Sequence, residues 1–213
     1  MTFHHPQDDI LLSYTAGALG ESWSLALASH LTFCPECRDA VAVAEELGGF
    51  LLENHDTAPL SDSALVLAQE QIEQQSVEPV SNNSPVLSSL PMPLRNYVGD
   101  TLGDLKWRSI GGGVYQYMIA TNDDDQARLL QIPAGRPVPE HGHGGRELTL
   151  VLSGNFSDQN GKFVAGDIED VSEEVTHKPL AGEGDDCICL VVTDAALRFK
   201  SFIPRIVQPF ISI

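Results

Sequence analysis

Residues 135–154 read GRPVPEHGHGGRELTLVLSG, and this stretch decides the fold of the C-terminal part of the chain. It places His141, His143 and Glu147 within seven residues, between glycines that suit turns. In a β-strand these three side chains share one face, because the side-chain period of a strand is two. Two imidazoles and one carboxylate on one face suit a divalent transition metal. The stretch therefore predicts a metal site on a strand.

The spacing G-x5-H-x-H-x3-E-x6-G resembles the first signature motif of the cupin superfamily, whose members are small antiparallel β-barrels with a metal in the mouth. In the second cupin motif a glycine precedes one more histidine, and Gly166 and His177 stand at that spacing. Ser172, Glu174 and Ala181 replace that motif's proline, glycine and asparagine, so its turn chemistry is lost. The alternative is a His-rich surface loop. The resemblance implies a site for zinc, or for Fe, Mn or Ni, with four ligands: His141, His143, Glu147 and His177.

A second metal signature, H-x3-C-x2-C, lies near the other end of the chain at His30, Cys34 and Cys37. Pro35 favours a new helix that begins there, with Cys34 as its cap. Both thiols then lie at a helix N-terminus, which favours thiolate ligands. A closed zinc site needs four ligands, and the fourth is one of the two histidines at positions 4 and 5. A redox CxxC, or a pair of buried thiols, is the alternative.

Composition limits the classes of protein that this chain can belong to. Its 213 residues allow one or two domains, and no apolar run is long enough to span a membrane. A signal peptide pattern is absent, and four cysteines in two close pairs do not resemble a secreted disulfide framework, so we expect a cytoplasmic protein.

The net charge of -18 is uneven, because residues 1–80 hold 13 acidic residues and a single basic one. This excess of negative charge disfavours nucleic-acid binding and favours a basic protein partner. The alternative is that the charge serves only to keep the chain soluble.

Apolar periodicity divides the chain into a helical part and a strand-rich part. Helices are predicted over 8–18, from 21 or 22 to 32, from 34 to 47 with Gly48 and Gly49 after it, and over 63–75. The helix over 63–75 is expected either to pack only loosely on the other helices or to pack against a partner protein. Strands are predicted at 115–119, 127–132, 147–152, 187–192 and 198–202, as in an antiparallel sandwich or barrel.

The sequence therefore predicts a two-domain α+β protein. A small helical domain held by zinc occupies residues 1–75, a linker rich in Ser, Asn and Pro occupies 76–93, and a cupin-type barrel occupies 94–213. Such a linker implies that the two domains fold independently. Cys187 and Cys189 point to one face of a strand and are interpreted as core thiols rather than a redox pair. Strand alternation directs Arg146 away from the metal.

An acidic helical zinc module followed by a cupin resembles one family over nearly the whole chain: the ChrR-type anti-sigma factors of bacteria. The order of the two motifs in one chain of this length makes the resemblance specific. It implies that the N-terminal domain binds an extracytoplasmic-function sigma factor, and that the cupin is needed for a response to singlet oxygen or peroxides. The family's zinc ligands correspond to His5, His30, Cys34 and Cys37.

Two rival hypotheses remain open. Cupin sites with three His and one Glu also hold Fe or Mn in dioxygenases and isomerases, so the barrel could be an enzyme with a helical accessory module. Alternatively, Cys34 and Cys37 could form a thiol switch that ejects zinc. Because no Ser–His–Asp arrangement, phosphate loop or nucleotide fingerprint is found, we predict no catalytic residue.

Overall fold

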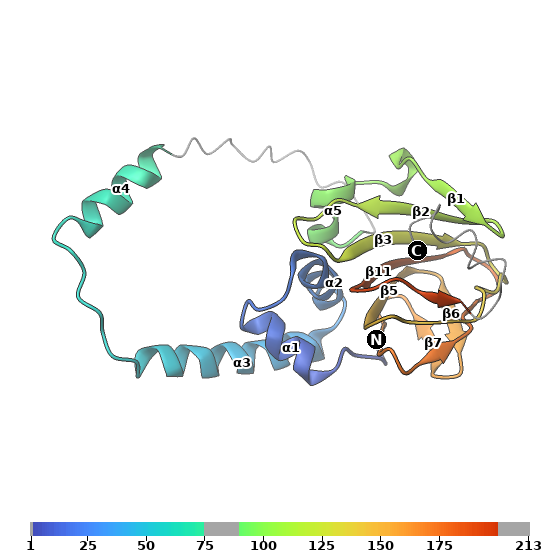
Figure 1. Ribbon diagram of the computed structural model, residues 1–213, viewed down its shortest axis with the longest axis horizontal. Helices are drawn as coiled ribbons and strands as arrows, with labels where there is room; N and C mark the ends of the chain where they lie inside the picture. Colours follow the sequence, from blue (N-terminus) through green and yellow to red (C-terminus); the bar gives the residue numbers. More distant parts are fainter. Residues whose placement is uncertain (1, 75–89, 200–213) are drawn as a thin grey trace.

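Helices form the N-terminal part of the protein and antiparallel strands form the C-terminal part (Figure 1). The computed structural model describes residues 2–74 and 90–199. The predicted α+β architecture, a helical module followed by a cupin-like β-structure, is confirmed. Among the described residues, no helix has both the length and the apolar character that a membrane span requires.

The four predicted helices are present, with α1 ending at Thr15 rather than near residue 18; α5 and η1 were not predicted, and α3 is longer than expected. This helix begins at the predicted place, with Cys34 as its N-cap, but continues through Gly48 and Gly49. A glycine costs a helix only about 1 kcal/mol relative to alanine, and proline does not return until Pro59, so two glycines do not end it. The helices are α1 (Asp8–Thr15), α2 (Glu21–Leu31), α3 (Pro35–Glu53), α4 (Ala64–Gln74), α5 (Met92–Val98) and the 3-10 helix η1 (Leu102–Asp104).

In residues 90–199, three antiparallel sheets make up the barrel. The largest has six strands in the order β1-β2-β3-β11-β5-β8, and the two small sheets have the orders β10-β6-β7 and β12-β4-β9. Residues 200–202 of the last predicted strand lie outside the described residues. The strands are β1 (Arg108–Gly111), β2 (Val114–Ile119), β3 (Gln126–Ile132), β4 (His141–Gly142), β5 (Glu147–Ser153), β6 (Asn155–Asp158), β7 (Gly161–Val164), β8 (Ile168–Val171), β9 (Thr176–His177), β10 (Leu180–Ala181), β11 (Cys187–Thr193) and β12 (Arg198–Phe199).

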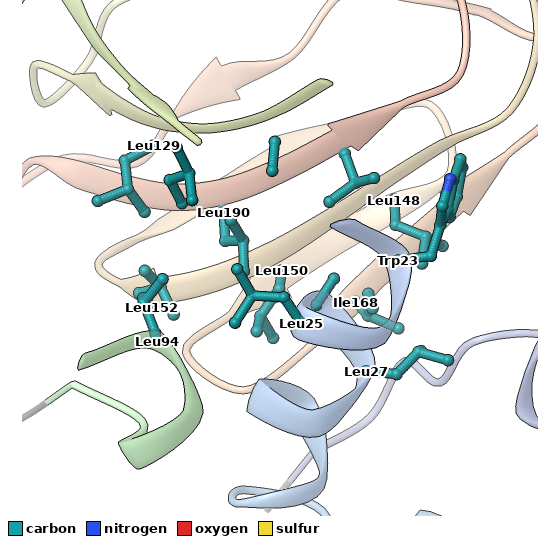
Figure 2. Close-up of a cluster of buried hydrophobic side chains, with 14 of the residues drawn as sticks. Trp23, Leu25, Leu27, Leu94, Leu129, Leu148, Leu150, Leu152, Ile168 and Leu190 are labelled. Atoms are coloured by element: carbon teal, nitrogen blue, oxygen red, sulfur yellow. The ribbon is translucent and has the colours of Figure 1, made fainter. Parts of the chain in front are cut away.

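The helical module and the barrel share one hydrophobic core. Helix α2 packs against the six-stranded sheet and buries Trp23, Leu25 and Leu27 among leucines from β3, β5 and β11 (Figure 2). Helix α5 closes the same cluster with the fully buried Leu94. The other face of this sheet packs a second cluster inside the barrel. Both sides of the central strands are therefore covered, which argues against the expectation that the two parts fold independently.

Polar contacts also join the two parts. The indole Nε1 of Trp23 donates to Asp125 Oδ2 at 2.7 Å, and the phenol of Tyr97 donates to Glu21 Oε1 at 2.6 Å. Arg146, expected to point away from the metal, bridges Asp9 Oδ2 at 2.7 Å and Asp170 Oδ2 at 2.6 Å. Its side chain does point away from the barrel interior, but toward α1 rather than toward water.

The domain limits 1–75 and 94–213 stay a prediction. Residues 76–89 of the predicted linker lie outside the described residues. The residues that follow belong to the packed structure, since Leu90 is buried and Met92 and Pro93 begin α5.

Candidate metal centres

Four side chains from three segments of the helical module converge in a first cluster, the helical cluster: His5, His30, Cys34 and Cys37. One ligand-type atom from each lies within 4.8 Å of the others. Both sulfurs lie 3.3 Å from His5 Nδ1, and Cys37 Sγ lies 3.3 Å from His30 Nε2. Two sulfurs and two ring nitrogens at this spacing form a donor set that suits tetrahedral zinc.

Local structure explains how these side chains meet. His30 occupies the last turn of α2, and the short turn after it brings the N-terminus of α3 back beside the ring. Cys34 Sγ accepts the Cys37 backbone N–H at 3.3 Å, which is how an N-cap residue orients its side chain. Of the two N-terminal histidines, His5 lies in the cluster, while His4 places its ring on Phe163 with its Nε2 3.2 Å from Lys162 O.

The chemistry of the helical cluster fits a bound cation. Burial lowers the pKa of His30 to about 4, so the ring is neutral at pH 7. Its Nδ1 lies 2.9 Å from the carbonyl of Gly166 and donates to it, which leaves Nε2 free to bind a metal. Burial also raises the pKa of the Cys37 thiol to about 12, and a bound cation would offset this by stabilising the thiolate. The barrel therefore supplies the carbonyl that orients one ligand of the helical module.

A second cluster, the barrel cluster, joins His141, His143, Glu147 and His177. All four are at most 5% exposed, and their ligand-type atoms also lie within 4.8 Å of one another. Register explains the arrangement, because β4 pairs with β9 so that His141 stands directly opposite His177. Their Nε2 atoms approach to 3.0 Å, which suits two ligands that face one ion.

The nitrogens of His141 and His177 that face away from the cluster have hydrogen-bond partners, whereas His143 lacks one. His141 Nδ1 donates to Pro139 O at 2.8 Å, and His177 Nδ1 lies 3.0 Å from Asp158 Oδ2. In the described part of the chain, His143 Nε2 is buried without a hydrogen-bond partner. A buried ring nitrogen without a partner is costly unless a metal binds it. The residues present therefore fit a divalent cation.

The shifted pKa values of His141 and Glu147 favour the deprotonated forms that bind a cation. Burial lowers the pKa of His141 to about 4. Burial alone would raise the pKa of Glu147, but the hydrogen bond from His143 and the nearby imidazoles lower it to about 2. Burial would lower the pKa of His177, but Glu169, Glu147 and Asp158 raise it above its ordinary value. Asp158 and Glu169 were not identified from the sequence, because nothing in their spacing relates them to His177.

The cysteine pair of β11 lies on the inner side of the barrel. Cys187 and Cys189 are buried with their sulfurs 3.5 Å apart, in agreement with the interpretation as core thiols. A cavity of about 420 Å³ opens above the barrel cluster, and Cys189 forms part of its wall.

The fold and the two clusters define a class of protein: a helical module with two cysteines and two histidines in one cluster, packed on a cupin barrel with its own cluster. Residues 97–196 match the family described as the ChrR cupin-like domain. The anti-sigma-E factor ChrR of Cereibacter sphaeroides is 46% identical over 210 residues, which are 99% of this chain and 98% of the relative.

A solved structure gives the same result. The chain resembles a chain of the crystal structure of Rhodobacter sphaeroides SigE in complex with the anti-sigma ChrR, with a TM-score of 0.78 and 42% identity. The match covers 91% of this chain and 100% of that chain. The chain therefore belongs to the ChrR family, and the resemblance stated from the two motifs is confirmed.

Proposed function

We propose that this protein is an anti-sigma factor whose helical module sequesters an extracytoplasmic-function sigma factor in the cytoplasm and keeps it from core RNA polymerase. The barrel, with its metal, makes release depend on a stress signal such as singlet oxygen or a peroxide. The helical cluster holds zinc through His5, His30, Cys34 and Cys37. The barrel cluster holds zinc or another divalent transition metal through His141, His143, Glu147 and His177.

One observation carries the proposal: an outer apolar surface on α3, α4 and the turn between them. Of the 16 exposed large apolar side chains among the described residues, ten belong to this surface. Helix α4 buries no residue, and Figure 1 shows it away from the rest of the protein. Such a surface marks a site for a partner protein. Its members are Val43, Leu47, Phe50, Leu51, Leu52, Leu60, Leu65, Val66, Leu67 and Ile72.

Charge supports a sigma factor as the occupant. Residues 1–80 carry 13 acidic residues and a single basic one. A protein that binds DNA and polymerase presents basic surfaces, and opposite potentials speed the encounter of two partners. The same charge opposes direct contact with nucleic acid. The relatives named above, an anti-sigma-E factor and a complex with SigE, agree with this partner.

Capture from the native cell tests the proposal. Full-length tagged protein should co-purify with a sigma factor, and metal analysis of the same sample should show zinc. Leu65→Asp places a charge in the apolar contact and should abolish capture. Tyr115→Asp, on the barrel strand β2 and 40% exposed, is the matched control and should leave capture unchanged. Wild-type protein that is folded and metal-loaded but captures no sigma factor would refute the proposal.

The cavity beside the barrel cluster favours a second candidate function, a cupin metalloenzyme of the dioxygenase or isomerase type. An enzyme should turn over a small apolar molecule with iron or manganese bound, and Glu147→Gln should end that turnover. An anti-sigma factor that only senses should bind such a molecule and release it unchanged. Product analysis by mass spectrometry separates the two functions.

A further inference from the structure

The segment before α1, residues 2–7, lies along the barrel and carries one ligand of the helical cluster. We call this segment the strap. Its His4 O accepts the Ile168 N–H of β8 at 3.2 Å, and its Gln7 N–H donates to Asp170 Oδ2 at 3.0 Å. Because β8 is the last strand of the six-stranded sheet, the strap lies beside the edge of that sheet.

One buried side chain of the barrel anchors the strap. Asp167 is 0% exposed, and its Oδ1 accepts the backbone N–H groups of Phe3 at 2.7 Å and of His4 at 3.3 Å. Its Oδ2 accepts the Val164 N–H at 3.0 Å, so the same side chain also shapes the turn between β7 and β8. Hydrogen bonds to a buried acceptor are stronger than exposed ones, because water competes with them less.

Side-chain packing completes the attachment of the strap. The ring of His4 lies on the buried ring of Phe163, with the two centroids 4.3 Å apart. Gly166 leaves room for close approach, because a Cβ at this position would lie 2.9 Å from both Thr2 Cγ2 and Phe33 Cβ. Phe33 belongs to the turn between α2 and α3. The strap and this turn, which together carry the ligands of the helical cluster, therefore meet on one glycine of the barrel.

The strap holds the ligand of the helical cluster that solvent reaches most easily. Nδ1 of His5 faces both sulfurs of the cluster, and the His5 side chain is 29% exposed. The other three ligands are at most 3% exposed. The outer nitrogen of His5 lies 3.5 Å from Oε2 of Glu36, whose side chain is 81% exposed and supports the ring weakly. The position of His5 therefore depends mainly on the strap.

We propose that the barrel controls the helical zinc site through the strap. While Asp167 holds the strap, His5 completes the ligand set. When these contacts open, His5 leaves and zinc is released more easily. The barrel thereby determines how firmly the helical module keeps its metal, in addition to orienting His30 through the carbonyl of Gly166. The inference rests on the zinc proposed for the helical cluster.

Cobalt loss from the full-length protein tests this control. The protein is loaded with Co²⁺ in place of zinc, and EDTA then removes the metal while the thiolate-to-cobalt charge-transfer absorption is followed. Of the two clusters only the helical cluster contains thiols, so this absorption reports its metal alone. Asp167→Ala should accelerate the loss at least about tenfold, because contacts that orient a metal ligand change metal affinity by roughly 10–100-fold. Asp185→Ala, at an exposed position, is the matched control and should leave the rate unchanged.

A double-mutant cycle separates control through the strap from a general loss of stability. Because the anchor acts through His5, Asp167→Ala should change the rate by less than about twofold in a His5→Ala background. Equal acceleration in both backgrounds would overturn the proposal, since Asp167 would then act through the fold as a whole rather than through His5.

A second variant tests the strap without altering the barrel. His4→Ala removes the packing on Phe163 and should accelerate cobalt loss at least about twofold. His55→Ala, at an exposed histidine outside the strap, should leave the rate unchanged. If Asp167→Ala does not fold, His4→Ala still decides, and an unchanged rate in His4→Ala would then contradict the proposal.

The outcomes can be separated from the proposed function. Wild-type protein without the thiolate absorption would contradict the metal of the helical cluster, and control through the strap with it. A normal absorption whose rate of loss is insensitive to both strap variants would contradict that control alone. Failure to capture a sigma factor, by protein that shows the absorption, would contradict only the anti-sigma function.

Discussion

The helical cluster and the barrel cluster each bring four ligand-type side chains within 4.8 Å, yet they are built differently. The helical cluster joins three segments, the N-terminal stretch, the end of α2 and the start of α3, none of which is a strand paired in a sheet. The barrel cluster lies on strands already paired in sheets and borders a cavity. A metal in the first therefore stabilises the fold, whereas a metal in the second is available to a ligand.

Removal of the thiols should give the largest effect. Wild-type protein should contain two metal ions per chain, and Cys34→Ala with Cys37→Ala should lose one of them and lower the stability of the helical module. Zinc binding of this kind contributes ~10–16 kcal/mol in small zinc domains, more than three short helices can replace. His141→Ala with His177→Ala should also lose one metal but remain folded. Elemental analysis and circular dichroism measure both, and one metal per chain that survives the cysteine changes would remove the helical site.

The shared core gives the next largest effect. Trp23→Ala should destabilise the protein by about 3–5 kcal/mol, because Trp23 is 6% exposed and fills the contact between α2 and the sheet. Leu12→Ala, at a site 59% exposed, should change stability by less than about 0.5 kcal/mol. Thermal unfolding of the wild type should show one transition for helices and barrel together. Two well-separated transitions would mean that the parts fold independently after all.

Much of this arrangement was predictable from local patterns. The fixed spacing of His141, His143 and Glu147 requires only that a strand has period two, and Cys34 followed by Pro35 indicates a helix start in any context. The contact of Arg146 with Asp9 spans 137 positions of sequence, and no local rule relates two such residues. The same holds for Asp158 and Glu169 beside His177. The docking of α2 on the sheet was missed because its apolar face also suits a helix bundle.

The pH dependence of the metal-free protein distinguishes the clusters further. His30 titrates near pH 6.5 when unfolded, but burial lowers its pKa to about 4 in the fold. The unfolded chain then binds more protons between these values, so stability is present above pH 6.5 and is lost as the pH falls toward 4. Between pH 6.5 and 5, His30 should contribute a loss of roughly 2 kcal/mol.

In the barrel cluster the shifts oppose each other, because the pKa of His141 is lowered and that of His177 is raised. His177 stabilises the fold at low pH, and its contribution is lost as the pH rises through its folded pKa. His30→Gln should therefore flatten the pH dependence more than His141→Gln with His177→Gln. Urea unfolding of chelator-treated protein at several pH values checks this, and the reverse ranking would contradict it.

The Arg146 bridge should give a smaller effect. Arg146→Gln leaves Asp170, whose side chain is 3% exposed, without its cation and should cost about 1–2 kcal/mol. Asp9→Asn removes only the exposed arm of the bridge, at a carboxylate 67% exposed, and should cost less than about 1 kcal/mol. Denaturant unfolding of the metal-loaded protein measures both. Equal costs would mean that burial of Asp170 does not decide the strength of the bridge.

The smallest effect on the free protein belongs to the outer apolar surface. Leu65→Asp should change the stability of the free chain by less than about 0.5 kcal/mol, because Leu65 is 70% exposed. Dissociation from the sigma factor should nevertheless become faster, since the charge enters a dry contact. Salt raised from ~50 to ~500 mM should slow association and leave dissociation nearly unchanged. Stopped-flow kinetics measure both rates, and an unchanged dissociation rate in Leu65→Asp would place α4 outside the interface.

Strand β8 and the turn before it touch both clusters, since Gly166 O accepts from His30 and Glu169 lies 3.4 Å from His177. Thermodynamic linkage makes any communication through this element reciprocal. If occupancy of the barrel weakens the hold on a sigma factor by some factor, a bound sigma factor must weaken the barrel's affinity for its own occupant by that same factor. The concentration of sigma factor in the cell would thus affect the concentration of occupant at which the barrel becomes filled.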